Sequence, residues 1–310
     1  MARECGQEGG MEFWILLAIA AAAFQTLRFM VQKRLSMGAL SAGGATWARF
    51  VYAAPFALVL AASYAVMIGW RPAGMGPLFW AYALTGGLAQ ILATWCVVAL
   101  FARRNFAVGI TFKKTEVIQT ALVGFIVLGD RISLWALAAI LLGLIGVLVL
   151  SDGVATGGRG WRRFANRSAA LGLTSGAFFA ISAVGYRGAT LEIASDDALM
   201  RAAMTLAMVT SAQTLGLGAW LGWREPGEIA RVWRARRQAV WMGVMGLGGS
   251  LCWFTAFTLQ NAAMVFAVGQ VEVIFSMLVS VAVFRERISG REMLGIALLT
   301  ASILALVVFG

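Results

Sequence analysis

Histidine is absent from this chain of 310 residues, and cysteine, proline and charged residues are scarce. The lack of histidine removes the commonest metal ligand and the side chain that most often titrates near neutral pH. The three cysteines, Cys5, Cys96 and Cys252, are odd in number and show no CxxC spacing, so they indicate neither a disulfide framework nor a metal site. No phosphate loop, nucleotide motif or Ser/His/Asp arrangement occurs, so neither an enzyme nor a cofactor is expected.

Charge is also low for a soluble protein. Only 13% of the residues are charged, 61% are hydrophobic, and the mean hydropathy is +0.83. Soluble domains carry roughly 25% charged residues. A single soluble core could not hide so much apolar surface, whereas a bilayer can. The apolar runs are about 20 residues long and do not alternate as barrel strands do, so the spans are expected to be helices.

Ten apolar runs are each long enough to cross roughly 30 Å of hydrocarbon. They cover residues 12–32, 44–69, 78–101, 106–128, 133–151, 168–190, 197–222, 238–259, 262–284 and 289–309. The predicted fold class is therefore an all-α membrane protein with ten transmembrane helices. Pro55 lies inside the second run and is expected to kink it.

The sequence repeats itself. Residues 115–133 read TEVIQTALVGFIVLGDRIS and residues 271–289 read VEVIFSMLVSVAVFRERIS, with nine of 19 positions identical. The stretch FAVG occurs upstream of both, but the first copy has four more residues between FAVG and this segment. The sequence thus predicts an N-terminal tail over residues 1–10 and two five-helix repeats over residues 11–151 and 168–310. A basic linker, residues 152–167, joins the repeats. Since each repeat crosses the membrane an odd number of times, the second is expected to be inverted, as in many secondary transporters.

Basic residues are distributed unevenly between the two sides of the predicted bundle. The connections after odd-numbered spans hold 16 lysines and arginines, and the other side holds five. The positive-inside rule then places both termini outside, in a multi-pass protein of the inner (plasma) membrane. The most extended basic segment, 224–237, fits either a short helix on the headgroups or a solvated loop.

Two glutamates are the most informative charged residues. Glu116 and Glu272 occupy matching repeat positions, each about ten residues into its span and thus near mid-membrane. One interpretation is a pair facing a central cavity, where it binds substrate or protons. The other is a structural pair that hydrogen-bonds neighbouring helices. Lys113 shares a helix face with Glu116, so it either forms an ion pair, leaving proton coupling to Glu272, or binds an anionic group of the substrate.

Further candidates for the cavity are polar or amphipathic side chains within or at the ends of spans. They are Gln25, Arg28, Gln119, Trp95, Trp253 and Gln270. Taken singly, each fits packing or interface anchoring as well as ligand contact.

Two stretches that contain an Asp/Glu-Arg-Ile-Ser motif carry a family resemblance. LGDRISLWALAAILLGLIGVLVL in the first repeat and FRERISGREMLGIALLTASILALVV in the second resemble the EamA-type drug/metabolite transporter superfamily. Arg49 in ATWARF resembles the arginine that opens the second helix of that family. The resemblance implies a ten-helix bundle with a central cavity, alternating access, and export or exchange of small metabolites. Better-known members place both termini in the cytoplasm, so the orientation predicted here from the charge bias differs from that of the family.

Together these features predict a secondary active transporter of a small polar or zwitterionic metabolite such as an amino acid, with proton coupling through a carboxylate as an option. Efflux of organic cations, as in small multidrug resistance proteins, and a passive channel are the alternatives. Lys113 and Lys114 argue against a purely cationic ligand. The expected partners are a small-molecule substrate, protons if transport is coupled to them, and the lipid bilayer. No nucleic acid is expected, and a monomer and a homodimer both remain open.

Overall fold

The computed structural model describes residues 5–36, 38, 40–71, 74–101, 113–151, 167–275, 278 and 290–309. Every regular element in these residues is a helix, which confirms the all-helical prediction. In chain order they are α1 (Cys5–Ser36), α2 (Ala42–Ile68), α3 (Pro77–Phe101), α5 (Glu116–Leu128), α6 (Leu134–Ser151), α7 (Arg167–Leu191), α8 (Ala198–Arg224), α9 (Glu228–Arg234), α10 (Arg236–Leu259), α11 (Ala262–Gly269) and α13 (Gly290–Phe309).

Helix α2 shows why the sequence folds as it does in a membrane. Ala53, Ala57 and Ala61 recur at every fourth position and are buried against the bundle. On the other side Phe56 is 59% exposed and Val66 is 82% exposed. Small residues therefore let the helices approach closely, while large apolar side chains point outward. Since lipid can cover such an outer surface and water cannot, the chain is an integral membrane protein.

Four helices of the described residues are long and apolar enough to cross a membrane. They cover Phe13–Ser36, Ala42–Ile68, Pro77–Leu100 and Arg236–Leu259. Each of the ten predicted spans contains a helix, and two spans are covered only in part. Two stretches lie outside the described residues, namely 102–112 in the first repeat and 279–289 in the second. They belong to, or adjoin, the fourth, ninth and tenth predicted spans.

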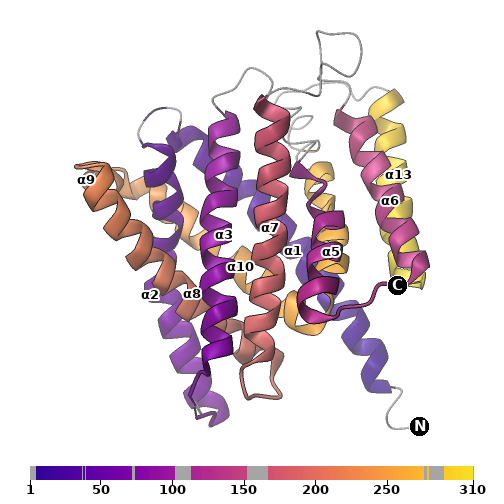
Figure 1. Ribbon diagram of the computed structural model, residues 1–310, viewed down its shortest axis with the longest axis horizontal. Coiled ribbons are helices and arrows are strands. Elements are labelled where there is room, and N and C mark those ends of the chain that lie inside the picture. Colours follow the sequence, from indigo (N-terminus) through magenta and orange to yellow (C-terminus); the bar gives the residue numbers. More distant parts are fainter. Residues whose placement is uncertain are drawn as a thin grey trace.

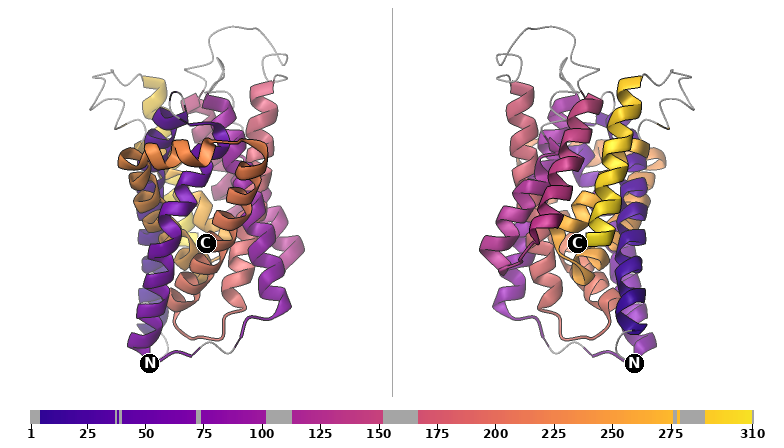
Figure 2. Two further views of the ribbon diagram at one scale, coloured as in Figure 1. Left: turned by 90° about the vertical axis from the view of Figure 1, so that its left-hand side faces the viewer. Right: turned by 90° about the vertical axis from the view of Figure 1, so that its right-hand side faces the viewer.

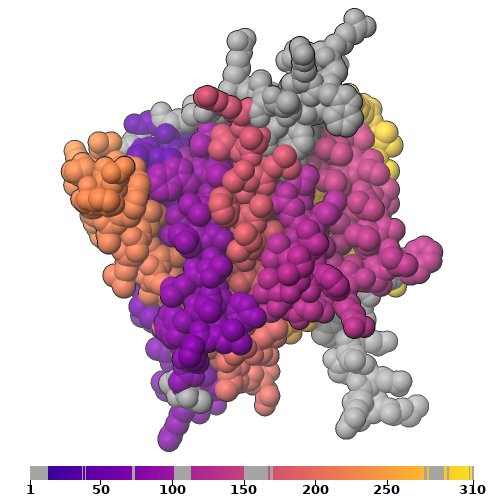
Figure 3. Space-filling view, in the orientation of Figure 1, coloured from indigo at the N-terminus to yellow at the C-terminus, as the bar shows by residue number. Residues whose placement is uncertain are grey.

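The helices run up and down through the bundle, and α1 and α7 run in opposite directions (Figure 1). Helix α3 packs along α7, and α1 packs along α10. Helices α6 and α13 form a pair at one edge of the bundle, and α9 lies at the opposite edge (Figures 1 and 2). The space-filling view shows α7 between α3 and α5 on one broad face (Figure 3).

The basic segment 224–237 contains a short helix, α9, so the helical alternative for this segment is confirmed. Its first residue, Glu228, is buried and accepts a hydrogen bond from the backbone N–H of Ser41, with a donor–acceptor distance of 2.6 Å. Glu228 also pairs with Arg231 at 3.0 Å. These contacts fix α9 against the beginning of α2.

Helices α3 and α7 are in backbone contact. A Cβ atom added at Gly185 of α7 would lie 2.9 Å from the Cα atom of Gly86 and 3.0 Å from the carbonyl oxygen of Tyr82. Neither neighbour can move without shifting α3. Glycine is therefore required at this crossing, which holds Tyr186 of α7 toward the centre of the bundle.

We expect Gly185→Ala to lower the free energy of unfolding by about 1–3 kcal/mol, because the added methyl group overpacks the crossing. Gly216→Ala in α8 is the matched control, since a Cβ atom there meets nothing within 4 Å. Thermal unfolding of the purified protein in detergent measures both variants. Equal melting temperatures for the two variants would contradict this account of the crossing.

Candidate functional site

Two lysine–glutamate pairs lie buried in the bundle. The Nζ atom of Lys113 is 2.7 Å from Oε1 of Glu116, and the Nζ atom of Lys114 is 2.6 Å from Oε2 of Glu272. All four residues are at most 8% exposed. The structure thus shows the ion pair that is one of the two roles expected of Lys113. The pairing of Lys114 with Glu272, across 158 positions of sequence, was not predicted.

Both glutamates follow an irregularity in the helical backbone. Helix α5 begins at Glu116, directly after turns at Lys114 and Thr115. The chain likewise forms a turn at Gln270 after α11, and becomes helical again at residues 271–275. The carboxylate of Glu116 therefore lies in the first turn of a helix, where the helix dipole favours a negative charge. The turn at 114–115 also frees Lys114 to point toward the other repeat.

Gln25 of α1 completes the environment of Glu272. Its Nε2 atom donates a hydrogen bond to Oε2 of Glu272 over 3.1 Å. Glu272 is thereby bonded to α1 and to Lys114 in the turn before α5. Both Gln25 and Glu272 were predicted site residues, and the structure places them in contact.

A small cavity of about 30 Å³ lies beside the Lys113–Glu116 pair, whereas Lys114 and Glu272 are not among the residues that line it. Its wall combines polar side chains with aromatic rings. The lining residues are Gln25, Arg49, Gln90, Lys113, Glu116, Phe179, Ser182, Ala183, Tyr186, Ser250, Trp253, Phe254, Phe257 and Phe266. A water molecule needs about 10–15 Å³ on this measure, so the cavity has room for a few waters and not for a metabolite.

Trp253 anchors the aromatic part of the wall. Its ring stacks on Phe257 at 5.7 Å and meets Phe266 edge-on at 5.3 Å between centroids. A Cβ atom at Gly269 would collide with the Trp253 ring, so the end of α11 can approach only because it is glycine. On the other side, the Phe179 ring centroid lies 4.8 Å from Nζ of Lys113, within cation–π range.

Two buried arginines lie in the same region. NH2 of Arg49 donates to Oγ of Ser250 over 3.0 Å, and its NH1 is buried without a hydrogen-bond partner. NH1 of Arg28 donates to Oε1 of Gln32 over 3.0 Å. Arg28 is affected by the positive charge of Arg49 and by the negative charge of Glu272. Among the sequence signals, only the resemblance of ATWARF to the family pointed to Arg49.

Tyr186 belongs to a hydrogen-bond network that joins α3, α7 and α8. Its hydroxyl donates to Oε1 of Gln90 over 3.0 Å. Gln213 donates to Gln90 over 3.1 Å and to the Gly87 carbonyl over 2.9 Å. The network fixes the floor of the cavity, and the amphipathic character of these residues was the only sequence signal for it.

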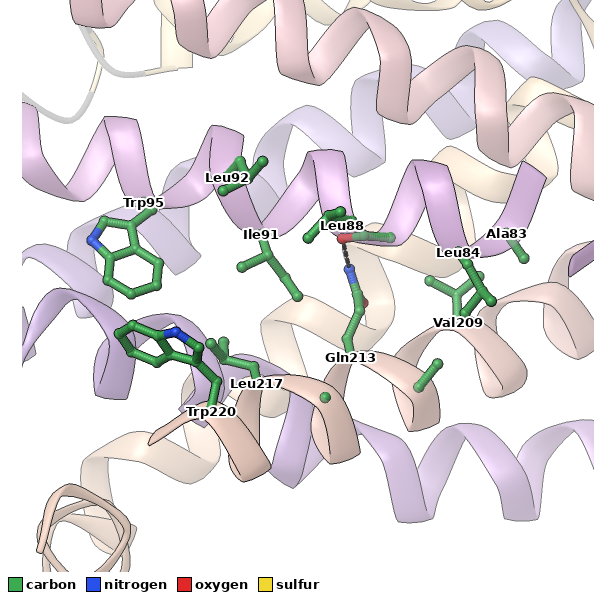
Figure 4. A pocket seen from close by; sticks show the side chains of 13 residues that line it. Ala83, Leu84, Leu88, Ile91, Leu92, Trp95, Val209, Gln213, Leu217 and Trp220 are labelled. Carbon is green, nitrogen blue, oxygen red and sulfur yellow. Dashed lines mark hydrogen bonds between the residues drawn. The ribbon is translucent and has the colours of Figure 1, made fainter. Parts of the chain in front are cut away.

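Trp95 does not line this cavity, although it was a predicted site residue. It lies in a separate apolar groove of about 460 Å³ between α3 and α8, where its ring meets Trp220 edge-on at 4.9 Å. Figure 4 shows both rings at one end of the groove, with Gln213 farther along. A tryptophan within an apolar run does not reveal which helix face carries it. The structure thus separates Trp95 from the two glutamates, and its predicted contact with substrate stays a prediction.

Gln119 and Gln270 also lie outside the cavity lining. Gln119 donates to Oγ1 of Thr115 over 3.1 Å, and it lies against Gly176 of α7. Gln270 lies toward α6, with its Nε2 atom 3.8 Å from the position of a Cβ atom at Gly143. Both therefore support the two backbone irregularities from behind.

Two buried atoms of the cavity lining have unused hydrogen-bonding capacity. They are NH1 of Arg49 and Oε2 of Glu116, neither of which has a partner among the described residues. Unsatisfied buried polar atoms are rare in native proteins. A ligand entering an enlarged cavity would meet both. In the described part of the chain, no group of three or more cysteine, aspartate or glutamate side chains could hold a metal ion.

We expect Lys114→Met to lower the free energy of unfolding by about 3–5 kcal/mol, because it removes the lysine from a buried ion pair. In the double variant Lys114→Met/Glu272→Gln, the carboxylate is replaced as well, and more than half of this loss should be recovered. Unfolding in detergent is followed for the wild type, both single variants and the double variant. The four free energies of unfolding give the coupling energy between Lys114 and Glu272. Additive effects of the two substitutions would show that the pair contributes nothing.

Comparisons with known proteins agree with this architecture. Residues 166–308 match the model of the EamA-like transporter family. No curated protein sequence matches the chain. A solved structure described as "Crystal structure of protein" is similar over 94% of this chain and 99% of its own, with a TM-score of 0.64 and 14% identity. At that identity the likeness concerns the fold. The family match confirms the resemblance drawn from the Asp/Glu-Arg-Ile-Ser stretches.

Proposed function

Because its residues 166–308 belong to the EamA-like transporter family, we propose that this membrane protein is a secondary active transporter. It exports or exchanges a small polar or zwitterionic metabolite, such as an amino acid, by alternating access. The observation that carries the proposal is the buried polar site, in which each repeat contributes one ion-paired glutamate and the Lys113–Glu116 pair lines a small cavity. Ionic side chains within a membrane are costly and are characteristic of transport pathways.

Alternating access requires two related halves that can move against each other. The opposite directions of α1 and α7 fit an inverted repeat. The packing fits it as well. Helices α1 and α7 are the first spans of the two repeats, and α3 and α10 are the third spans. In each of the contacts α3–α7 and α1–α10, the first span of one repeat packs against the third span of the other. The small volume of the cavity, about 30 Å³, fits a stage between an inward-open and an outward-open form.

Glu272 is the proposed site of proton coupling. Its partner Lys114 comes from the other repeat, so a movement between repeats changes the distance between the two charges. Glu116 pairs with Lys113 within a single turn, and that pair travels as a unit. When Lys114 withdraws, the Glu272 carboxylate lies in a site of low polarity, where uptake of a proton becomes favourable.

The test of transport starts from ligands found by thermal shift, since a ligand that binds only the folded protein raises its apparent stability. In proteoliposomes the wild type should accumulate such a ligand against its gradient when a proton gradient is imposed. Glu272→Gln should still exchange ligand but lose the response to pH, whereas Lys113→Ala should keep that response. Flux that no gradient drives uphill would indicate a channel, and unchanged pH dependence in Glu272→Gln would exclude coupling through this residue.

Orientation follows from the charge bias, and we propose that both termini lie outside the cell. The basic helix α9 and its flanking arginines then face the cytoplasm, where anionic headgroups attract them. A reporter enzyme that is active only in the periplasm, fused after Gly310, should therefore be active. A cytoplasmic reporter at the same position is the control, and activity of that reporter alone would reverse the assignment.

A further inference from the structure

Positive charge exceeds negative charge at the centre of the bundle. Among the described residues, six buried ionic side chains contribute to this region. They are the cations Arg28, Arg49, Lys113 and Lys114, and the carboxylates Glu116 and Glu272. Glu228, which is also buried, lies apart in α9 and pairs with Arg231. With every group in its ordinary charge state, the central set carries a net charge of +2.

The excess charge is located on the two arginines. Each lysine has its own glutamate, at 2.7 and 2.6 Å. No carboxylate of the described residues lies within ion-pair distance of Arg28 or Arg49. NH1 of Arg49 is also without a hydrogen-bond partner, although Arg49 is 94% buried and lines the cavity. An uncompensated guanidinium group in the membrane is strongly unfavourable unless a counter-ion joins it.

Part of the cavity wall is apolar and aromatic. Trp253, Phe257 and Phe266 contact one another there, and Phe179 lies beside Lys113. Aromatic faces of this kind favour flat, unsaturated bodies of a ligand over extended polar ones. Charge and apolar surface therefore meet in one site.

We propose that the site binds organic anions that carry a carboxylate and a flat apolar body, with the carboxylate on Arg49. The inference rests on the proposed transport function and narrows its substrate class from polar or zwitterionic to net anionic. A bidentate guanidinium–carboxylate contact satisfies the unused NH1 atom and neutralises part of the excess charge. A zwitterion could also place an ammonium group on the free Oε2 atom of Glu116, but it would leave the net charge of +2 unchanged.

Three probes that share one phenyl ring and a short chain separate the charge classes. They are 3-phenylpropanoate as the anion, L-phenylalanine as the zwitterion and 2-phenylethylamine as the cation, and butanoate is an anion without the ring. Thermal shift of the purified full-length protein, at fixed pH and ionic strength, should give 3-phenylpropanoate at least a tenfold lower Kd than each of the other three. A larger shift with the amine or with phenylalanine, or no shift with 3-phenylpropanoate at millimolar concentration, overturns the proposal.

Arg49 is tested by substitutions that separate its charge from its shape. Arg49→Gln should abolish the thermal shift with 3-phenylpropanoate, and Arg49→Lys should retain part of it. The lysine variant keeps the positive charge, so it still tests the proposal if the glutamine variant fails to fold. Arg224→Gln is the control, because it removes the same charge from an exposed position at the end of α8. An undiminished shift in folded Arg49→Gln or an equal loss in Arg224→Gln would exclude the proposed role.

Transport of the same probes separates the two proposals. Binding of 3-phenylpropanoate without counterflow in proteoliposomes would leave the anion site intact and remove the transport function. Uptake of phenylalanine or of the amine, without binding or uptake of the anion, would leave the transport function intact and remove the anion site. Arg49-dependent counterflow of 3-phenylpropanoate supports both.

Discussion

A charge inside a bilayer has no water to solvate it, so the arrangement of this protein depends on where its buried charges find partners. The contact between Lys114 and Glu272 satisfies this requirement across the two repeats. It connects the turn before α5 with the helical segment that follows α11. Gln25 adds a third segment, α1, to the same carboxylate. The pair therefore joins segments that apolar packing alone would leave free to slide.

Close backbone packing makes such a pair possible, because it keeps lipid and bulk water away from it. Gly176 of α7 lies against the carbonyl oxygen of Lys113, and Gly269 lies under the Trp253 ring. At both positions a methyl group would displace its neighbour, so each glycine permits an approach to the charged site. The glycine content, a weak signal when read as composition, acquires a specific meaning at these crossings. The cavity remains small because these approaches close it from both sides.

The sequence predicts the features that follow from local periodicity and from repetition. Apolar run length gives the positions of the helices, and the internal match between residues 115–133 and 271–289 identifies Glu116 and Glu272. The spacing of three positions correctly predicts the contact of Lys113 with Glu116, although turns at Lys114 and Thr115, and not a continuous helix, join the two residues. The Lys114–Glu272 and Arg49–Ser250 contacts depend on which faces of distant helices meet, which no single segment encodes. The position of Trp95 in the groove beside Trp220 likewise depends on its helix face, which its residue type does not reveal.

The asymmetry between the repeats is located in the four residues that the first repeat has and the second lacks. Those residues extend the connection that carries Lys113 and Lys114, so both lysines come from one repeat while the glutamates come from both. One ion pair is then internal to a repeat and the other bridges the two. If the repeats move against each other, as alternating access proposes, the internal pair stays unchanged and the bridging pair is stretched. Any charge exchanged during such a movement is therefore expected at Glu272 and not at Glu116, although the two occupy equivalent positions in sequence.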